Sequence, residues 1–215
     1  MPSKSSRRRR PRKQKTNYTK IIAIVVLLAV VAVIVGIMLN NDNSTVEGEV
    51  EELTQMKVLF ETSMGNITIQ LRDDMPITTT NFKNLVHQGV YNDVDFHRVI
   101  NLPNNLVMIQ GGDPTETGYG DPSIPTIKDE FSDDPENNKN ERGTIAMANT
   151  GQPNSGSSQF FINGAYNSHL DNKHPVFGEV IAGMDDVVDA ILNVETDEND
   201  RPIEDVTLIR ATLID

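Results

Sequence analysis

The hydrophobic pattern near the N-terminus is dominated by one long apolar run. Residues 21–39 carry no charged or strongly polar side chain. As a helix that rises about 1.5 Å per residue, the run is about 29 Å long, close to the roughly 30 Å hydrocarbon core of a bilayer. A cleavable signal peptide has a shorter apolar core that ends at a small-residue cleavage site. We therefore expect one uncleaved transmembrane helix at residues 21–39, with the lipid bilayer as its partner.

Beyond residue 55 the pattern changes to short apolar segments, which are typical of a β-rich domain. Alternating apolar residues on both sides of Gly65 predict a hairpin, and helical spacing predicts helices at 76–89 and from Met184 to about Leu192. Six other short apolar segments are expected to form strands: 94–100, 106–110, 144–147, 160–162, 176–180 and 206–214. Many short strands with only two helices, and no alternation of strand and helix, predict a mainly β fold, either an antiparallel barrel or a sandwich.

Charge divides the chain at the apolar run. The chain has 19 Lys and Arg and 31 Asp and Glu, a formal net charge of −12. Residues 1–20 hold nine of the basic residues and no acid, so the part after residue 40 carries 10 − 31 = −21. Because basic flanks stay in the cytoplasm, we expect a single-pass protein of the cell membrane with a basic cytoplasmic arm at 1–20. A flexible acidic linker at 40–55 and a domain at 56–215 would then lie outside the cytoplasm.

The composition also excludes several classes of function. An acidic surface repels phosphate backbones, so the domain at 56–215 is not expected to bind nucleic acid. The chain has no cysteine, which excludes disulfides, thiol catalysis and Cys-ligated metal sites. A contact of the basic arm with anionic lipid or nucleic acid stays open. Asn43-Ser44-Thr45 fits a glycosylation acceptor, which is a weak signal.

Four motifs occur in order within the domain. They are 96–100 (FHRVI), 108–114 (MIQGGDP), 147–162 (MANTGQPNSGSSQFFI) and 170–178 (LDNKHPVFG). Together they resemble the cyclophilin family of peptidyl-prolyl cis-trans isomerases over about residues 56–215. The resemblance implies a closed eight-stranded antiparallel barrel capped by two helices. It also implies proline-containing polypeptides as substrates and neither a metal nor a cofactor.

The chemistry of proline isomerisation shows why these residue types matter. Rotation about an X–Pro bond loses amide resonance over a barrier of about 18–20 kcal/mol, and the twisted imide nitrogen becomes a hydrogen-bond acceptor. A guanidinium is a permanent donor that suits this nitrogen. By resemblance, Arg98 is this donor, Gln110 orients Arg98, and Asn149 offers backbone hydrogen bonds. The other positions that match the family's substrate-binding residues are Val107, Met108, Ala148, Gln159, Phe161, His169, Leu170 and His174.

The sequence departs from the family pattern at several of these places. Val107 stands where an aromatic residue is usual, which removes part of the surface that grips proline. His169 stands where tryptophan is usual, which removes an indole donor and puts cyclosporin binding in doubt. The connection at 101–105 is longer than in the commonest members, and Glu116 lies in a loop where small residues are usual.

These departures leave alternatives to an efficient isomerase. A catalytically weak module could bind proline-containing segments of partners at the membrane surface. A hydrolase that uses Ser157 or Ser158 with His174 and Asp171 is a further alternative, although the chain has no Gly-x-Ser-x-Gly elbow. An isomerase that assists the folding of proteins outside the cytoplasm is the leading hypothesis.

Overall fold

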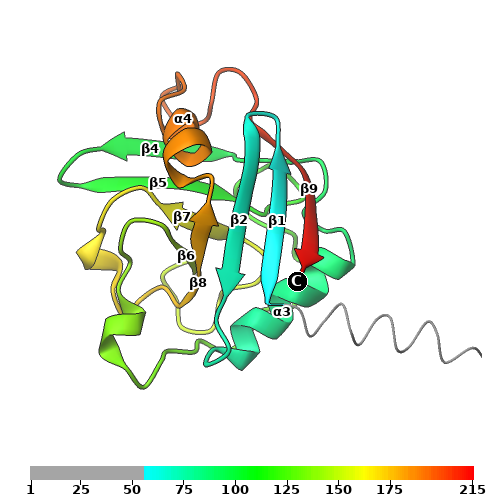
Figure 1. The fold of residues 1–215 in the computed structure, drawn as a ribbon, viewed down its shortest axis with the longest axis vertical. Helices are drawn as coiled ribbons and strands as arrows, with labels where there is room; N and C mark the ends of the chain where they lie inside the picture. The colour runs from blue at the N-terminus through cyan, green and yellow to red at the C-terminus, as the bar shows by residue number, and fades with distance from the viewer. Residues whose placement is uncertain (1–55) are drawn as a thin grey trace, which may run out of the picture. The chain divides into compact units, whose positions relative to one another are not determined.

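A computed structural model of the chain describes residues 56–215. Its strands form one sheet in the order β3-β9-β1-β2-β8-β6-β7-β5-β4, with each neighbouring pair antiparallel. The strands are β1 (Lys57–Thr62), β2 (Gly65–Leu71), β3 (Val94–Asp95), β4 (Arg98–Leu102), β5 (Leu106–Gly111), β6 (Thr144–Met147), β7 (Phe160–Asn163), β8 (Val176–Ala182) and β9 (Thr207–Ile214). The helical segments are α3 (Pro76–His87), η1 (Pro135–Asn138), η2 (Ser168–Leu170), η3 (Met184–Val188) and α4 (Asp189–Leu192). In Figure 1, α4 lies at the upper end of the curled sheet and α3 at its lower end.

The sequence features before the domain are not part of the described structure. The predicted arm, the predicted anchor at 21–39, the linker and the Asn43 acceptor all lie outside residues 56–215. Within residues 56–215, none of the helices has the length and apolar character needed to cross a bilayer. The anchor therefore stays a prediction from the sequence.

The sheet curls into a half-barrel but does not close, so the expectation of a closed eight-stranded barrel is wrong. Its ends are β3 and β4, which pair, among the described strands, only with β9 and with β5. The strand expected at 94–100 is split between them, because Phe96 and His97 leave the strand pattern. The Phe96 ring is buried against Phe160, with 6.3 Å between the ring centroids. The chain leaves the strand at this gap, and the described strands form an open sheet of nine.

The β1–β2 hairpin is confirmed. Val58 pairs with Ile69 and Phe60 pairs with Ile67. All four side chains are buried, as the alternating pattern predicts for one face of a half-exposed sheet. Gly65 ends the turn with a φ of 130°, which only glycine adopts without strain. The other strand segments outside 94–100 also form strands, with bounds within two residues of those expected.

Both predicted helices are also present, each with a detail that the sequence pattern did not reveal. Helix α3 begins at Pro76, and two of its first backbone N–H groups donate to the carboxylate of Glu130 at 3.1 and 2.9 Å. This distant carboxylate takes the place of a local N-cap side chain. The second helix begins as the π-helical η3 and continues as α4, since the N–H groups of Val187 and Val188 both donate to the carbonyl of Gly183 at 3.0 Å.

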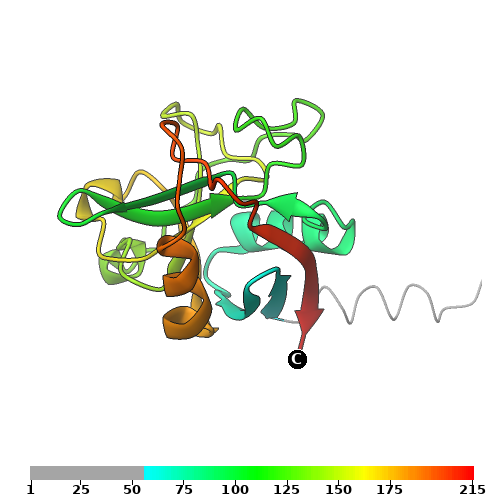
Figure 2. The ribbon, with the colours of Figure 1, turned by 90° about the horizontal axis from the view of Figure 1, so that it is seen from above.

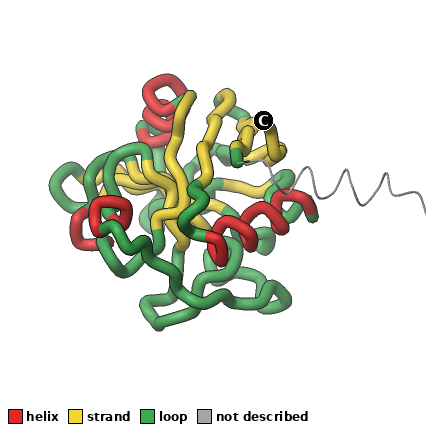
Figure 3. The backbone as a smooth tube through the Cα atoms, turned by 60° about the horizontal axis from the view of Figure 1, so that its bottom comes forward, coloured by secondary structure: helices red, strands yellow, loops and turns green. Residues whose placement is uncertain are grey.

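An aromatic cluster fills the space between α3 and the inner face of the sheet. Neighbouring ring centroids within it lie 5.0–6.2 Å apart. Its members are Phe60, Phe82, Tyr91, Phe160 and Phe177, all buried. Figure 3 shows α3, which supplies Phe82, across the lower opening of the curled sheet. Because this face of the sheet is filled, a ligand can approach only the opposite face and the loops at its edges.

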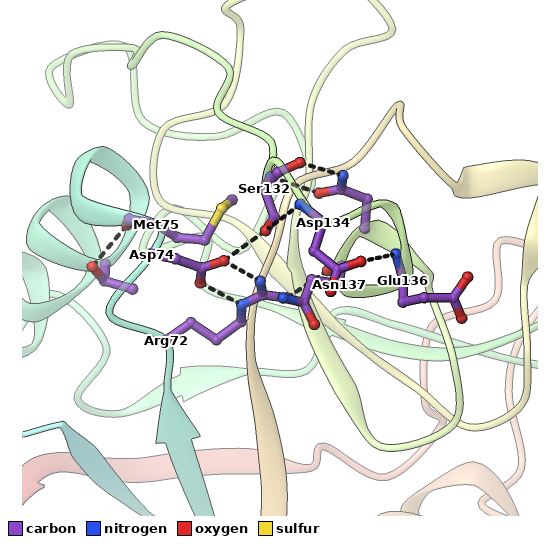
Figure 4. A network of polar contacts seen from close by, with 9 residues as sticks. Arg72, Asp74, Met75, Ser132, Asp134, Glu136 and Asn137 are labelled. Atoms are coloured by element: carbon purple, nitrogen blue, oxygen red, sulfur yellow. Dashed lines mark hydrogen bonds and ion pairs between the residues drawn. The ribbon is translucent and has the colours of Figure 1, made fainter.

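A polar network holds the long connection between β5 and β6 against the end of β2 (Figure 4). Arg72 donates to the carboxylate of Asp74 and to the carbonyl of Asn137, and the hydroxyl of Ser132 also donates to Asp74. The hydrogen bonds from Arg72 favour the charged carboxylate and lower the pKa of Asp74 to about 2. The network fixes η1 beside the start of α3.

Candidate active site

One row of side chains crosses the sheet on the face opposite the aromatic core. In the strand register, Arg98 of β4 pairs with Gln110 of β5, and Gln110 pairs with Phe161 of β7. Phe161 pairs in turn with Ala146 of β6. Residues directly opposite one another in an antiparallel pair point to the same face. The row therefore places a guanidinium, an amide and a phenyl ring next to one another.

An apolar cluster surrounds the phenyl end of this row. Its buried members are Ile100, Met108, Ala146, Phe161 and Val176, and the partly buried Leu106, Ala148 and Leu170 pack against them. Four of the residues expected at the site belong to it, namely Met108, Ala148, Phe161 and Leu170. A partly exposed apolar surface next to a few polar groups is the usual character of a ligand site.

Arg98 and Gln110 have hydrogen-bond partners that the sequence did not suggest. Nε and Nη2 of Arg98 both donate to Oδ2 of Asp200 at 3.3 Å. Nε2 of Gln110 donates to Oε1 of Gln159 at 2.8 Å, and Nε2 of Gln159 donates to the carbonyl of Gly118 at 3.1 Å. Gln110 thus lies opposite Arg98 on the neighbouring strand and ties a loop to the sheet through Gln159.

Two hollows open on either side of Gln110. The first, of about 290 Å³, includes Arg98 in its lining, and the second, of about 200 Å³, includes Asn149. Gln110 and Gly118 line both hollows. Their walls come from three loops that Figure 2 shows gathered on one side of the β4–β5 pair: 113–121, 149–157 and 195–203.

Asn149 and His174 border the same surface. Nδ2 of Asn149 donates to the carbonyl of Lys173 at 2.8 Å, whereas the backbone N–H and C=O of Asn149 have no protein partner within residues 56–215. The His174 ring meets the Phe161 ring edge-on with 5.3 Å between centroids, and its Nδ1 lies 3.2 Å from the carbonyl oxygen of Met147. Burial lowers the pKa of His174 below its ordinary value, so the ring is neutral near pH 7.

The structure does not bring Val107 and His169 into this cluster. Val107 precedes Met108 on β5 and therefore points to the other face, where it is buried in the main core. Its backbone N–H and C=O are bonded to the side chain of Asn167. His169 lies in η2 beside Leu170 but is exposed. The missing aromatic ring at Val107 is therefore a change in the core rather than in the apolar cluster.

The family model for cyclophilin type peptidyl-prolyl cis-trans isomerases matches residues 57–213. This chain belongs to the cyclophilin family. Two relatives and one solved structure illustrate the similarity. Peptidyl-prolyl cis-trans isomerase-like 1 of Aspergillus fumigatus is 43% identical over 159 residues, which are 74% of this chain and 95% of that protein. A peptidyl-prolyl cis-trans isomerase of Arabidopsis thaliana is 41% identical over 160 residues, 74% of this chain and 94% of that protein.

The solved structure is a crystal structure of a cyclophilin type peptidyl-prolyl cis-trans isomerase of Cryptosporidium parvum, determined in the presence of the dipeptide Ala-Pro. It has a TM-score of 0.66 and 29% sequence identity, and the match covers 74% of this chain and 99% of that one. The similarity extends over almost the whole length of these proteins. The chain is thus a peptidyl-prolyl cis-trans isomerase of the cyclophilin class.

The residues of the hydrolase alternative are not arranged as a catalytic triad in this cyclophilin. The carboxylate of Asp171 accepts hydrogen bonds from the Tyr166 hydroxyl and from a backbone N–H, both at 2.7 Å. The Nδ1 of His174 faces a backbone carbonyl instead of Asp171. The hydroxyl of Ser158 is buried without a partner in the described structure. The hydrolase alternative therefore lacks the His–Asp contact that it requires.

Sequence reasoning missed two acidic residues that shape the cyclophilin site. Asp200 reaches Arg98 from 102 positions away along the chain, and no spacing rule connects the two. Asp113 lies within the second motif, and its buried carboxylate accepts hydrogen bonds from Thr115, Gly118 and Gly120. An aspartate followed at short range by threonine and glycines is typical of an Asx turn, so a local signal existed for Asp113.

The second glycine of the cyclophilin motif at 108–114 is predicted to be essential for stability. Gly112 has a φ of 82°, and an added Cβ would lie 2.7 Å from the carbonyl oxygen of Ser158 and 2.9 Å from the Phe160 ring. Gly112→Ala should therefore combine backbone strain with steric overlap, and we expect it to lower the free energy of unfolding by about 2–3 kcal/mol. Gly151 has a φ of 81° with nothing within 4 Å, so Gly151→Ala should show the strain alone. Equal losses in urea melts of the two variants would contradict this account.

The stability of the cyclophilin domain should fall on acidification, partly because of the buried His97 and the partly buried His174. Burial lowers the pKa of His97 and of His174. Below the ordinary histidine pKa of about 6.5, the unfolded chain takes up protons that the folded rings do not, so unfolding becomes easier until the folded pKa values are reached. A second loss should follow between pH 3.8 and about 2, where Asp74 is protonated only in the unfolded chain. In thermal melts between pH 7.5 and 5, the melting temperature of His174→Gln should fall less with falling pH than that of the wild type. The exposed control His169→Gln should show the same fall as the wild type.

Proposed function

We propose that this cyclophilin is anchored in the cell membrane by residues 21–39 and isomerises X–Pro bonds of proteins outside the cytoplasm, which assists their folding. The location is supported by the apolar run and by the nine basic residues that precede it. The catalytic assignment is supported above all by the juxtaposition of Arg98 with the apolar cluster that contains Met108 and Phe161.

In this proposal the substrate proline ring lies on Met108, Phe161 and Leu170. The cluster is apolar but partly open at Leu170 and Ala148, so a small ring can replace water there. The backbone N–H and C=O of Asn149, which have no protein partner within residues 56–215, can bond the extended peptide. The Cryptosporidium relative crystallised with Ala-Pro supports a dipeptide-sized site of this kind.

Arg98 then donates to the imide nitrogen as the X–Pro bond twists. The nitrogen accepts a hydrogen bond only when its lone pair is freed from resonance, so this contact stabilises the transition state and not the ground state. A hydrogen bond to a charged group contributes about 1.5–3 kcal/mol, whereas a thousandfold acceleration needs about 4 kcal/mol. The remainder must come from holding the peptide partly twisted between Asn149 and the apolar cluster.

Four further residues expected at the site, Gln110, Gln159, Ala148 and His174, have supporting tasks in this scheme. Gln110 and Gln159 are joined by a hydrogen bond and hold Gly118, which forms a wall of both hollows. Ala148 keeps the second hollow wide enough for a peptide backbone. His174 packs edge-on against Phe161 and fixes the angle of that ring.

An NMR exchange experiment on a short Ala-Pro peptide tests this function. Catalytic amounts of a soluble fragment of residues 50–215 should broaden the separate cis and trans signals and produce exchange cross-peaks. Binding shifts without faster exchange would favour the alternative, a module that holds proline-containing segments. Absence of both effects would exclude the isomerase and the binding module together.

The proposed location needs a separate experiment on the full chain in cells. We expect the protein to stay in the membrane pellet after alkaline carbonate extraction, and a variant without residues 1–39 to be soluble. Protease added to cells with an accessible surface should remove the domain at 56–215. Full-length protein in the carbonate supernatant would contradict the anchor, and protection of the domain from protease would contradict its outside location.

A further inference from the structure

A short acidic loop contacts the guanidinium of Arg98. The loop is closed at its base by a backbone bridge between Thr196 and Pro202. Asp200 of this loop accepts hydrogen bonds from both Nε and Nη2 of Arg98, each at 3.3 Å, through the single oxygen Oδ2. The backbone of the same residue is also tied to β4, since its carbonyl accepts from the N–H of Val99 at 2.8 Å. Asp200 is therefore fixed to the strand that carries Arg98.

The loop is internally bonded, so Asp200 is held in place from both sides. Oδ1 of Asp197 accepts from the N–H groups of Asn199 and Arg201 at 2.8 and 2.9 Å. The N–H of Asp197 donates to the carbonyl of Arg201 at 2.8 Å. The Arg201 guanidinium donates to the carbonyl of Glu116, which joins this loop to the 113–121 loop across the first hollow. Because the loop is held by these hydrogen bonds, the Asp200 carboxylate has a fixed position at which it can bind the flexible Arg98 side chain.

The backbone of Asp200 adds a second observation. It has a φ of 64°, in the left-handed region that glycine favours and that asparagine and aspartate adopt more readily than other residues. Asp93 has a similar φ of 56° but is exposed, and its carboxylate has no hydrogen bond to Arg98 in the described structure. The two residues therefore share a backbone conformation but differ in whether the carboxylate meets Arg98.

We propose that Asp200 is a positioning residue that orients the Arg98 guanidinium toward the substrate. This inference rests on the proposed role of Arg98 as the donor to the imide nitrogen. Asp200 occupies Nε and one hydrogen of Nη2, which leaves Nη1 and the other hydrogen of Nη2 without a protein acceptor within residues 56–215. Arg98 lines the first hollow, and because Asp200 holds one edge of its planar guanidinium, the remaining donors have a defined orientation there. A pre-oriented donor avoids the entropy of ordering a long side chain during the reaction.

Asp200→Asn tests the proposal, because asparagine has the same size and accepts the same backbone conformation without the charge. We expect kcat/KM to fall about fivefold to tenfold, with the loss in kcat and KM nearly unchanged. The melting temperature should match that of the control Asp93→Asn, since the Arg98–Asp200 pair is about 40% exposed on both sides and such pairs add little stability. In an Arg98→Ala background, Asp200→Asn should have no further effect on kcat.

Two outcomes would overturn the proposal. Equal activity of Asp200→Asn and Asp93→Asn would show that the carboxylate does not matter, and a raised kcat would show that it competes with the substrate for Arg98. A measurement that does not depend on catalysis separates this proposal from the proposed function. In NMR spectra, the Arg98 Nε–H signal should be protected from solvent exchange in the wild type and lose that protection in Asp200→Gly, which keeps the backbone conformation but has no side-chain acceptor. If the Arg98 Nε–H signal were equally protected in the variant and the wild type, Asp200 would not position Arg98, even if the wild type isomerises proline.

Discussion

Arg98→Ala is expected to lower kcat/KM for an Ala-Pro peptide by about tenfold to a hundredfold, with almost all of the loss in kcat. The donor to the imide nitrogen acts only in the twisted state, so its removal leaves the ground-state contacts with the apolar cluster in place. The range corresponds to the loss of one hydrogen bond to a charged group, about 1.5–3 kcal/mol. NMR exchange measurements on the Ala-Pro peptide at several peptide concentrations separate kcat from KM.

Arg142 provides a matched control for this substitution. Its side chain is 41% exposed, close to the 43% of Arg98, and it also forms ion pairs, with Asp185 and Asp189 at 2.8 Å. It lies beside η3 and α4 and lines neither hollow of the site. Arg142→Ala should therefore leave the kinetics unchanged. A fall in melting temperature for Arg98→Ala that exceeds that of Arg142→Ala, with activity lost in proportion, would instead assign Arg98 a structural role.

Local signals made most of the fold predictable. The β1–β2 hairpin and α3 are encoded by the alternating residues around Gly65 and by Pro76 with its helical apolar spacing. The open sheet has no such local signal. The chain leaves the strand at Phe96, whose ring packs on Phe160 from 64 positions later in the chain, within what looks like one continuous strand at 94–100. The pattern of hydrophobic residues cannot distinguish an inward ring from a residue of an unbroken strand.

The site was predictable to the extent that motif residues share a face of the sheet. Met108 and Phe161 are both in the apolar cluster, and Arg98 and Gln110 are paired in the register. Val107 shows the limit of matching motifs by position, since one step along β5 moves a side chain to the opposite face. Strand alternation in the sequence at 106–110 could have indicated this difference.

The polar partners of the site residues were much less predictable. Gln110 is bonded to Gln159 and Arg98 to Asp200, and these contacts join parts of the chain that are 49 and 102 positions apart. The direction of a polar side chain is decided by loops whose paths follow from the packing of the whole domain. A single sequence contains no periodic signal for such pairs.

The strongest expected effect on stability comes from Asp113. Its side chain is fully buried, and its carboxylate accepts hydrogen bonds from the N–H groups of Thr115, Gly118 and Gly120 at 2.9, 2.7 and 3.1 Å. Burial by itself raises the pKa of Asp113, but these hydrogen bonds outweigh it and hold the pKa below its ordinary value. The carboxylate is thus charged at neutral pH and is the centre around which the 113–121 loop is built.

Asp113→Ala removes the acceptor from three backbone donors at once, and we expect it to lower the free energy of unfolding by about 4 kcal/mol in urea melts. Since Gly118 and Gly120 line the hollows, the folded fraction should also show a higher KM for the peptide, with kcat reduced less. Asp121→Ala is the matched control, because Asp121 lies in the same loop but accepts a single backbone N–H, from Ser123 at 2.8 Å. If Asp113→Ala and Asp121→Ala were equally stable, the loop would be held by its own backbone and not by the buried charge. A kcat loss with unchanged KM would mean that the loop acts on Arg98 rather than on the width of the hollows.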